Sequence, residues 1–414
     1  LMLAAGYGIA PFFIRVIAPG FEGERLQLAL KMNTIMLPSL VFLGLMGLYT
    51  GIFQAYRLFT LPALAGLLYN TCLIGFLVGA KHYPLISLGF GGLTGTMVQV
   101  LVLMVFARRV WPEWGMQFRF THPMLQKVWK LMIPIFIGTG VGYVNLIIDR
   151  IFASLLPVGT IAALNFAMRV KEIPTGLFAV ALSQATYPVT ALQATRGETQ
   201  GLRDLFSRSL ETLWLFIIPS AAGLLILPQE TVRFLFERGA FTGEATAITA
   251  QALFFYILGL PATASLGIIV NIFYSFQDTS TPVKVGIAGL LLNILLNAVL
   301  IHRMAHRGLA LATSLSATFM FLALLEILRR RVHGIGGKIL LPNLGKILLA
   351  TLVMAVCLFF LRPFAQTLLG YLGVIATGVI IYGISIFFLK PRSSEKIIET
   401  FQRIWKRFRP QRGV

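Results

Sequence analysis

Charge is scarce in this chain, and acidic charge is the scarcest. Charged residues make up 12% of the 414 positions, with 15 Asp and Glu against 35 Lys and Arg. Hydrophobic residues make up 57%, and the mean hydropathy is +0.83. A soluble globular chain does not tolerate so apolar a composition, so the sequence predicts a polytopic membrane protein.

Reactive side chains are also few. Cys72 and Cys357 each lie inside an apolar run, which argues against a disulfide framework or thiol chemistry. The five His residues lie in loops or at the ends of apolar runs, so the sequence offers no metal cluster. Ser-His-Asp, CxxC, Walker and paired-carboxylate motifs are absent, and we expect no enzymatic activity. The basic residues lie between apolar runs without stacking aromatics, and we expect no nucleic-acid partner.

Runs of about 20 apolar residues predict membrane spans. Alternation of period two is absent, and backbone groups in lipid must bond internally, so we expect helices and an all-α fold. Twelve spans are predicted, with approximate limits 1–17, 34–54, 58–80, 84–107, 130–155, 159–188, 205–227, 246–275, 281–301, 306–330, 344–363 and 368–389.

The distribution of basic residues predicts the orientation. Loops on the side of the C-terminal tail carry 23 Lys and Arg, and loops on the other side carry 8. By the positive-inside rule, the C-terminus is cytoplasmic. Apolar residues at helical spacing in 391–414, including Phe401 and Trp405, lie opposite basic ones, which indicates an amphipathic helix on the membrane surface. A solvated charged tail is the alternative.

An internal repeat relates the second and eighth spans. Leu37-Pro38 matches Leu260-Pro261, and Ile52–Tyr56 before Pro62 matches Ile272–Phe276 before Pro282. Two parallel six-helix halves would explain this spacing, although chance similarity between apolar segments is an alternative. If the repeat is genuine, the first half should have three helices before the second span, and the chain supplies one. We therefore expect two further helices before Leu1.

Charged residues occur deep inside the sixth span. Arg169 lies about ten residues beyond Gly159, a depth of roughly 15 Å. Glu172 shares its helix face, Lys171 is adjacent, and Pro174 interrupts the hydrogen-bond ladder just beyond them. Such a helix is typical of the lining of a water-filled cavity, and the net positive charge favours an anionic ligand. The alternative is a buried Arg169–Glu172 pair that joins neighbouring helices.

A second polar set lies at one depth near the outer ends of three spans. Its members, one carboxylate, two amides and one hydroxyl, are Asp149, Asn293, Asn297 and Thr313. Oxygen ligands of this kind suit a small cation. The alternative is that the Asn and Thr side chains bond between helices while Asp149 pairs with an Arg.

Four segments carry a family resemblance. They are Ala18–Phe21 (APGF), Leu235–Phe241 (LFERGAF), Gly259–Pro261 (GLP) and Phe273–Pro282 (FYSFQDTSTP). The chain resembles the MurJ (MviN) lipid II flippases of the multidrug/oligosaccharidyl-lipid/polysaccharide (MOP) exporter superfamily over its whole length apart from the tail. The resemblance implies two helical lobes around a central cationic cavity, followed by two helices that form a groove for a polyprenyl tail.

On this pattern the N-terminal lobe is 1–112, with four spans and without its first two helices, and the six-span C-terminal lobe is 113–333. The pair of groove helices is 334–390, and the amphipathic tail is 391–414. The resemblance implies a transporter rather than an enzyme, translocating lipid II across the bacterial inner membrane by alternating access. A related exporter of drugs or other polyprenyl-linked glycans is the alternative. Membrane lipid and the cell-wall synthesis machinery are the other implied partners.

The resemblance also implies roles for the two polar sets. Arg169, with Glu172 and Lys171, would bind the pyrophosphate head group, and Asp149, Asn293, Asn297 and Thr313 would bind sodium as a coupling ion. An acidic residue occurs in some members at the position of Asn297, so the set has less negative charge here. No other cofactor is implied.

Overall fold

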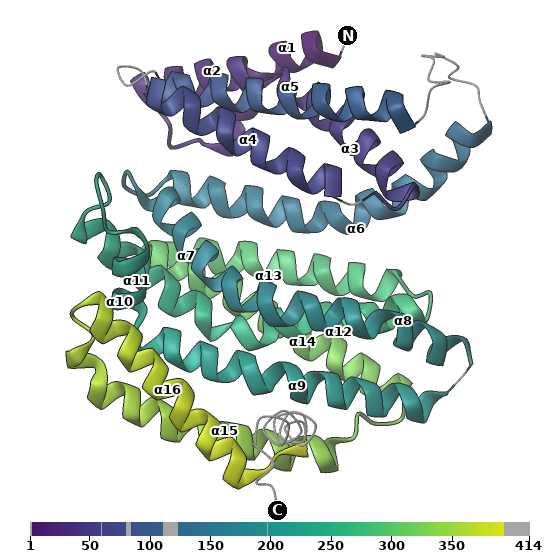
Figure 1. The fold of residues 1–414 in the computed structure, drawn as a ribbon, viewed down its shortest axis with the longest axis vertical. Coiled ribbons are helices and arrows are strands. Elements are labelled where there is room, and N and C mark those ends of the chain that lie inside the picture. Colours follow the sequence, from purple (N-terminus) through teal and green to yellow (C-terminus); the bar gives the residue numbers. More distant parts are fainter. Residues whose placement is uncertain (1, 59, 80–83, 111–122, 197, 393–414) are drawn as a thin grey trace, which may run out of the picture. The chain divides into compact units, whose positions relative to one another are not determined.

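The computed structural model describes residues 2–58, 60–79, 84–110, 123–196 and 198–392, and these residues are helical nearly throughout (Figure 1). They divide into two compact units, Leu1–Ile133 and Pro134–Val414. The division lies inside helix α6 (Pro123–Ser154), whereas the sequence placed the second lobe's start at residue 113. The predicted tail helix lies outside the described residues.

Within its described residues, the first unit contains five complete helices. They are α1 (Met2–Ile17), α2 (Gly23–Met36), α3 (Ser39–Ala55), α4 (Thr60–Gly79) and α5 (Pro84–Val110). Helix α2 lies mostly outside the predicted span 34–54, because Glu24, Arg25 and Lys31 lower its hydropathy. A small core holds α3, α4 and α5 together around Tyr49 and Phe53.

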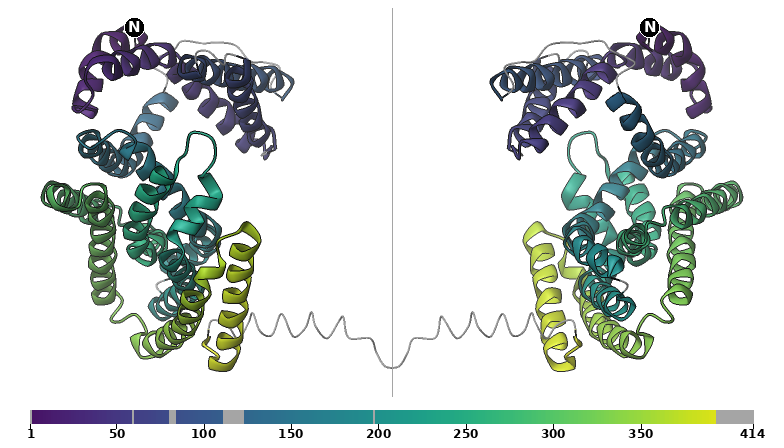
Figure 2. Two further views of the ribbon diagram at one scale, coloured as in Figure 1. Left: turned by 90° about the vertical axis from the view of Figure 1, so that its left-hand side faces the viewer. Right: turned by 90° about the vertical axis from the view of Figure 1, so that its right-hand side faces the viewer.

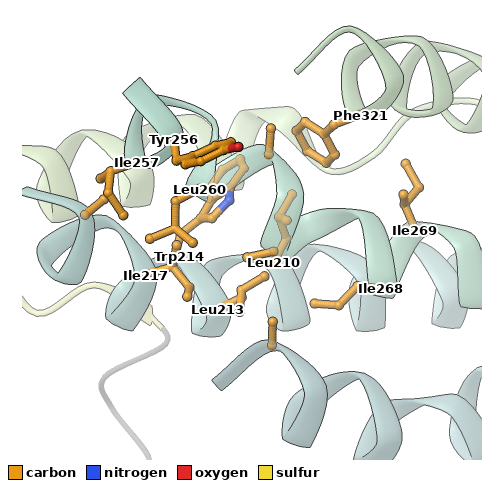
Figure 3. Packing of buried hydrophobic residues seen from close by; sticks show 14 of the residues in the cluster. Leu210, Leu213, Trp214, Ile217, Tyr256, Ile257, Leu260, Ile268, Ile269 and Phe321 are labelled. Carbon is orange, nitrogen blue, oxygen red and sulfur yellow. The ribbon is translucent and has the colours of Figure 1, made fainter. Parts of the chain in front are cut away.

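The second unit contains the remaining helices. They are α7 (Thr160–Pro174), the π-helix η1 (Thr175–Val180), α8 (Ala181–Thr195), α9 (Thr199–Ile226), α10 (Pro228–Phe236), α11 (Gly243–Leu258), α12 (Leu260–Ser275), α13 (Ser280–Met304), α14 (His306–Arg331), α15 (Gly337–Leu361), the 3-10 turn η2 (Arg362–Phe364) and α16 (Leu368–Leu389). Side chains from α9, α11, α12 and α14 converge in its core, with Trp214 and Leu260 among them (Figure 3). Helices α15 and α16 lie side by side and both contact α9 (Figure 2).

Most of the predicted spans are confirmed by length and composition. Within the described residues, α4, α5, α9, α13, α14, α15 and α16 are each long and apolar enough to cross a bilayer, and the bent pairs α2–α3 and α11–α12 bring the number to nine. The other three predicted spans, on α1, α6 and the run from α7 to α8, do not meet this criterion. Helix α1 has only 16 residues, and α7 carries Arg169, Lys171 and Glu172.

The structure shows the predicted repeat as matching geometry within each unit. The pair α2–α3 bends by 42° next to Pro38, and α11–α12 bends by 47° next to Pro261. Helices α2, α3 and α4 each pack against α5, as α11, α12 and α13 pack against α14. The same four-helix arrangement therefore occurs twice.

The helix ends inside the repeat also match. Arg57 and Gln277 follow α3 and α12 with φ of 61° and 57°. The next amide in each unit donates back to a buried phenylalanine carbonyl, from Leu58 to Phe53 at 2.8 Å and from Asp278 to Phe273 at 2.9 Å. This is the Schellman type of helix end, in which left-handed backbone lets a later amide satisfy a carbonyl of the last turn.

The bend between α11 and α12 depends on a glycine. A Cβ added at Gly259 would lie 2.6 Å from Ser314 Cα on α14. Ser314 Oγ donates to the carbonyl oxygens of Phe255, at 2.7 Å, and Tyr256, at 3.2 Å, in the last turn of α11 before the bend. The close approach to α14 thus supplies a hydrogen-bond donor to backbone carbonyls at the bend, as buried backbone in a membrane span requires.

Candidate functional site

Arg169 and Glu172 form an exposed ion pair on α7. Arg169 Nη1 lies 3.5 Å from Glu172 Oε2, and the two side chains are 79% and 53% exposed. The spacing of three residues places them on one helix face. Because both remain accessible, the pair does not join buried helices, and the guanidinium keeps donors free for an anionic ligand.

Lys171 lies on a different side of α7. The residue is 8% exposed, and its Nζ stands 5.1 Å from the centre of the Tyr256 ring on α11. The sequence grouped Lys171 with the head-group residues, and the structure separates it from them. Two positions along a helix turn a side chain by roughly 200°, so Lys171 faces the core while Arg169 and Glu172 face outward.

Pro174 changes the helix without ending it. The chain stays helical from Thr160 to Thr195, with the π-helix at Thr175–Val180 immediately after the proline. Thr175 Oγ1 donates to the Lys171 carbonyl at 3.2 Å and so gives it a partner. The predicted interruption of the ladder is therefore a widened turn, a feature that is frequent at functional sites.

The structure brings the second polar set together. Asn297 Nδ2 donates to Asp149 Oδ1 at 2.8 Å and to Asn293 Oδ1 at 2.9 Å. Thr313 Oγ1 lies 3.3 Å from Asp149 Oδ2. These side chains, which we call the polar cluster, come from α6, α13 and α14 and agree with the depth prediction. The hydrogen bonds between helices match one half of the alternative, but the Arg partner of Asp149 does not occur among the described residues.

The oxygen atoms of the polar cluster suit a small cation once the side-chain amide of Asn297 is rotated. Asn297 Oδ1 is buried and has no hydrogen-bond partner among the described residues. Turning the Asn297 amide by 180° would direct this oxygen toward Asp149 and Asn293, whose own oxygens already converge there. Carboxylate, amide and hydroxyl oxygens are suitable ligands for a hard cation.

A large apolar cavity lies beside α7. Its volume is about 930 Å³, and its walls come from α7, η1, α9, α10, α15 and α16. Ile173, one helical turn beyond Arg169, is part of the wall. Thr231 and Tyr371 add two hydroxyl groups to this apolar wall, and the Tyr371 hydroxyl donates to Thr231 Oγ1 at 3.0 Å. The sequence did not identify the cavity residues, because they are apolar like the lipid-facing ones.

The glycines of α16 differ in their surroundings. A Cβ at Gly378 would lie 2.8 Å from Leu358 on α15, so this glycine permits close packing. Gly373 and Gly383 have no described atom within 4 Å of an added Cβ, and Gly383 lines the cavity. Gly140 and Gly142 on α6 are equally open.

The LFERGAF segment fixes the turn between α10 and α11 to α7. Phe236 and Phe241 pack on Phe166, with ring centres 4.7 and 5.2 Å away. Thr246 Oγ1 donates to Glu237 Oε2 at 2.7 Å, which ties the turn to the first turn of α11. Phe166 precedes Arg169 by three residues, so this aromatic cluster holds the part of α7 that carries the exposed pair.

The DTSTP segment connects α12 to α13. Asp278 accepts hydrogen bonds from the Thr281 amide at 3.0 Å and from the Ser280 and Thr281 hydroxyls, and Arg331 at the end of α14 donates to it at 2.6 Å. Burial raises the pKa of Asp278, but these hydrogen bonds outweigh burial and lower the pKa to about 2. The segment therefore has a structural role in joining three helices.

Comparison with known proteins identifies the family. The family model described as "Lipid II flippase MurJ" matches residues 1–379. The chain belongs to the MurJ family of lipid II flippases. It is 29% identical over 370 residues to the probable lipid II flippase MurJ of Rhizobium tropici, covering 87% of this chain and 69% of the relative. It is also 29% identical over 340 residues to the lipid II flippase MurJ of Burkholderia cenocepacia, covering 80% and 66%. The chain thus spans about two thirds of the length of these relatives.

Solved structures support the same assignment. A lipid II flippase MurJ in an inward closed conformation matches with a TM-score of 0.80 at 27% identity, covering 94% of this chain and 80% of the other. An inward-facing multidrug resistance MATE family transporter of the MOP superfamily matches with a TM-score of 0.67 at 13% identity, covering 80% and 77%. The second likeness shows the fold alone. The chain is therefore a multi-pass membrane protein of a transporter family with the fold of the MOP exporters.

Proposed function

We propose that this chain translocates lipid II across the bacterial inner membrane by alternating access. The observation that carries the proposal is the position of Arg169, whose exposed guanidinium lies one helical turn from the wall of the apolar cavity. A lipid with a pyrophosphate head and a polyprenyl tail has an anionic group next to a long apolar chain. Helix α7 offers the matching pair, a cationic side chain next to an apolar cavity. Family membership supports the same substrate.

Each end of the substrate has a proposed site. Arg169 binds the pyrophosphate through charge-assisted hydrogen bonds, which replace the water lost from the head group. Glu172 holds the guanidinium in place before the substrate arrives, since it lies 3.5 Å away. The cavity between α7, α9 and the pair α15 and α16 holds part of the tail by burying apolar surface. Lys171 takes no part in head-group binding because its side chain faces the core.

The polar cluster is proposed to hold a sodium ion. Asp149, Asn293, Asn297 and Thr313 would be its ligands, with the Asn297 amide turned as described above. A bound cation would supply positive charge among α6, α13 and α14. The single carboxylate of the cluster favours weak binding, because affinity for hard cations rises with the number of charged ligands.

We propose that the C-terminus is cytoplasmic, in agreement with the excess of basic residues on its side. Substrate would then enter from the cytoplasmic leaflet and leave to the outer one. Enzymes of cell-wall synthesis that consume lipid II outside the membrane are the proposed downstream partners.

Binding selectivity tests the proposal. Purified protein in lipid nanodiscs should bind fluorescent lipid II saturably, and an excess of a cationic drug should not displace it. Undecaprenyl pyrophosphate without the glycopeptide should compete, because it carries both recognised features. Displacement by cationic drugs, together with weak competition by the pyrophosphate lipid, would instead favour a drug exporter.

A further inference from the structure

Lys171 is a buried cation without a hydrogen bond or ion pair to its ammonium among the described residues. It is 8% exposed, and its Nζ lies over the Tyr256 ring at 5.1 Å. A cation over an aromatic face is stabilised, but by less than the cost of taking an ammonium out of water. The position therefore requires negative charge nearby.

Two carboxylates act on Lys171. Glu172 is adjacent in sequence, but its side chain is 53% exposed and already paired with Arg169. Asp149 belongs to the polar cluster, and its charge interacts with that of Lys171. Glu172 has the larger effect of the two, but solvent screens its exposed side chain, which leaves Asp149 as the partner of Lys171 inside the unit.

Asp149, in turn, requires positive charge nearby. Its described hydrogen bonds come from the neutral donors Asn297 and Thr313, which supply no charge. A carboxylate in a membrane span is costly unless a cation compensates it. Helix α7, which carries Lys171, contacts both α11 and α14, and Thr313 of the polar cluster lies on α14. Lys171 therefore lies on a helix that packs against one of the helices that carry the polar cluster.

We propose that Lys171 is the resident counter-ion of Asp149. Its tethered ammonium supplies the positive charge that a bound cation would otherwise supply, and so it weakens sodium binding to the polar cluster. The sodium part of this inference rests on the sodium site proposed above, and the pairing of Lys171 with Asp149 does not. In this chain the cluster stays close to neutral without any bound ion.

Thermal stability in nanodiscs tests the pairing. The proteins are wild type, Lys171→Met, Asp149→Asn and the double variant, each melted in choline chloride and in equimolar sodium chloride. Each single change should lower the melting temperature, and the double variant should be more stable than the sum of the two losses predicts. Sodium should raise the melting temperature of Lys171→Met more than that of wild type, and it should leave the two proteins that carry Asp149→Asn unchanged. Lys284→Met, at an exposed lysine of α13, is the matched control and should be additive with Asp149→Asn.

The outcomes of this experiment distinguish the pairing of Lys171 with Asp149 from the sodium site. Additive losses from Lys171→Met and Asp149→Asn would overturn the pairing. Coupled losses without a sodium response in Lys171→Met would support the pairing and overturn the sodium site. If Lys171→Met does not fold, a folded double variant supports the pairing, and an unfolded one overturns it. None of these readings uses lipid II, so they stand apart from the proposed transport activity.

Discussion

Arg169 combines exposure with a position ten residues inside a helical run. The side chain is 79% exposed, and its pair with Glu172 is of the solvent-accessible kind that adds little stability. A charge at this depth is therefore better explained by ligand binding than by folding. Lys171, two residues on, is buried and faces the core beside Tyr256 instead. Adjacent charges on one helix thus have separate roles.

Replacing Arg169 should weaken head-group binding. Loss of its charge-assisted hydrogen bonds should cost about 1.5 to 3 kcal/mol, or roughly 10- to 100-fold in lipid II affinity. Arg169→Lys should lie between wild type and Arg169→Ala, because an ammonium cannot form the bidentate contact. Titration of fluorescent lipid II measures both variants, and Arg150→Ala, at an exposed neighbour of the polar cluster, is the control. Unchanged affinity in Arg169→Ala would remove it from the head-group site.

Asp278 should give a stability contribution that disappears in acid. Its pKa of about 2 lies below the unfolded value of about 3.9. The contribution is therefore fully present above pH 4 and is lost as pH falls from about 4 toward 2. The difference in melting temperature between wild type and Asp278→Asn should be constant from pH 7 to 5 and shrink below pH 4. A difference independent of pH would show that the carboxylate is not held ionised by these bonds.

Among the helices, α7 and α16 supply the walls that a lipid tail would meet. Gly383 lines the cavity and has open space where a side chain would begin, whereas Gly373 has the same open space away from the cavity. The two positions on one helix make a matched pair.

Filling the cavity should weaken tail binding. Gly383→Trp should reduce affinity for lipid II and for undecaprenyl pyrophosphate, because the indole takes the volume that the tail would occupy. Gly373→Trp should leave both affinities close to wild type. A soluble head-group analogue without the tail should bind Gly383→Trp normally. Equal effects of the two tryptophans would argue against a tail site in this cavity.

Hydropathy and proline positions predicted most helices, because lipid requires long apolar runs with internal backbone bonding. The match of Leu37-Pro38 with Leu260-Pro261 and the common depth of Asp149 and Asn297 came from the sequence alone. The structure shows a bend beside each proline and a hydrogen bond between Asn297 and Asp149. Other features depend on tertiary packing. Helix α2 is too polar for a hydropathy window, the direction of Lys171 depends on which face of α7 meets α11, and cavity residues look like lipid-facing ones in sequence.

Over the whole molecule, the repeated four-helix arrangement gives each unit a bent helix at an equivalent place. The bends of 42° and 47° occur beside prolines, and both following helices end in the same left-handed turn. Two similar units are what alternating access between repeats requires. The direction of transport depends on the orientation of both in the bilayer.

Cysteine labelling tests the proposed orientation. In a background with Cys72→Ala and Cys357→Ala, Ala240→Cys should react with an impermeant thiol reagent added to intact cells. Gln200→Cys should react only after the membrane is permeabilised. Both positions are exposed and lie at opposite ends of the second unit's spans. The reverse labelling pattern would contradict the orientation inferred from the basic residues.

Reconstituted translocation is the most direct measurement of the central claim. Proteoliposomes containing fluorescent lipid II are treated with an impermeant quencher, which destroys the signal of molecules that reach the outer leaflet. Wild-type protein should make nearly all of the lipid II accessible, whereas Arg169→Ala should leave about half protected, as in liposomes without protein. Equal accessibility with wild type and Arg169→Ala, or protection of half the lipid II by both, would contradict transport through this site.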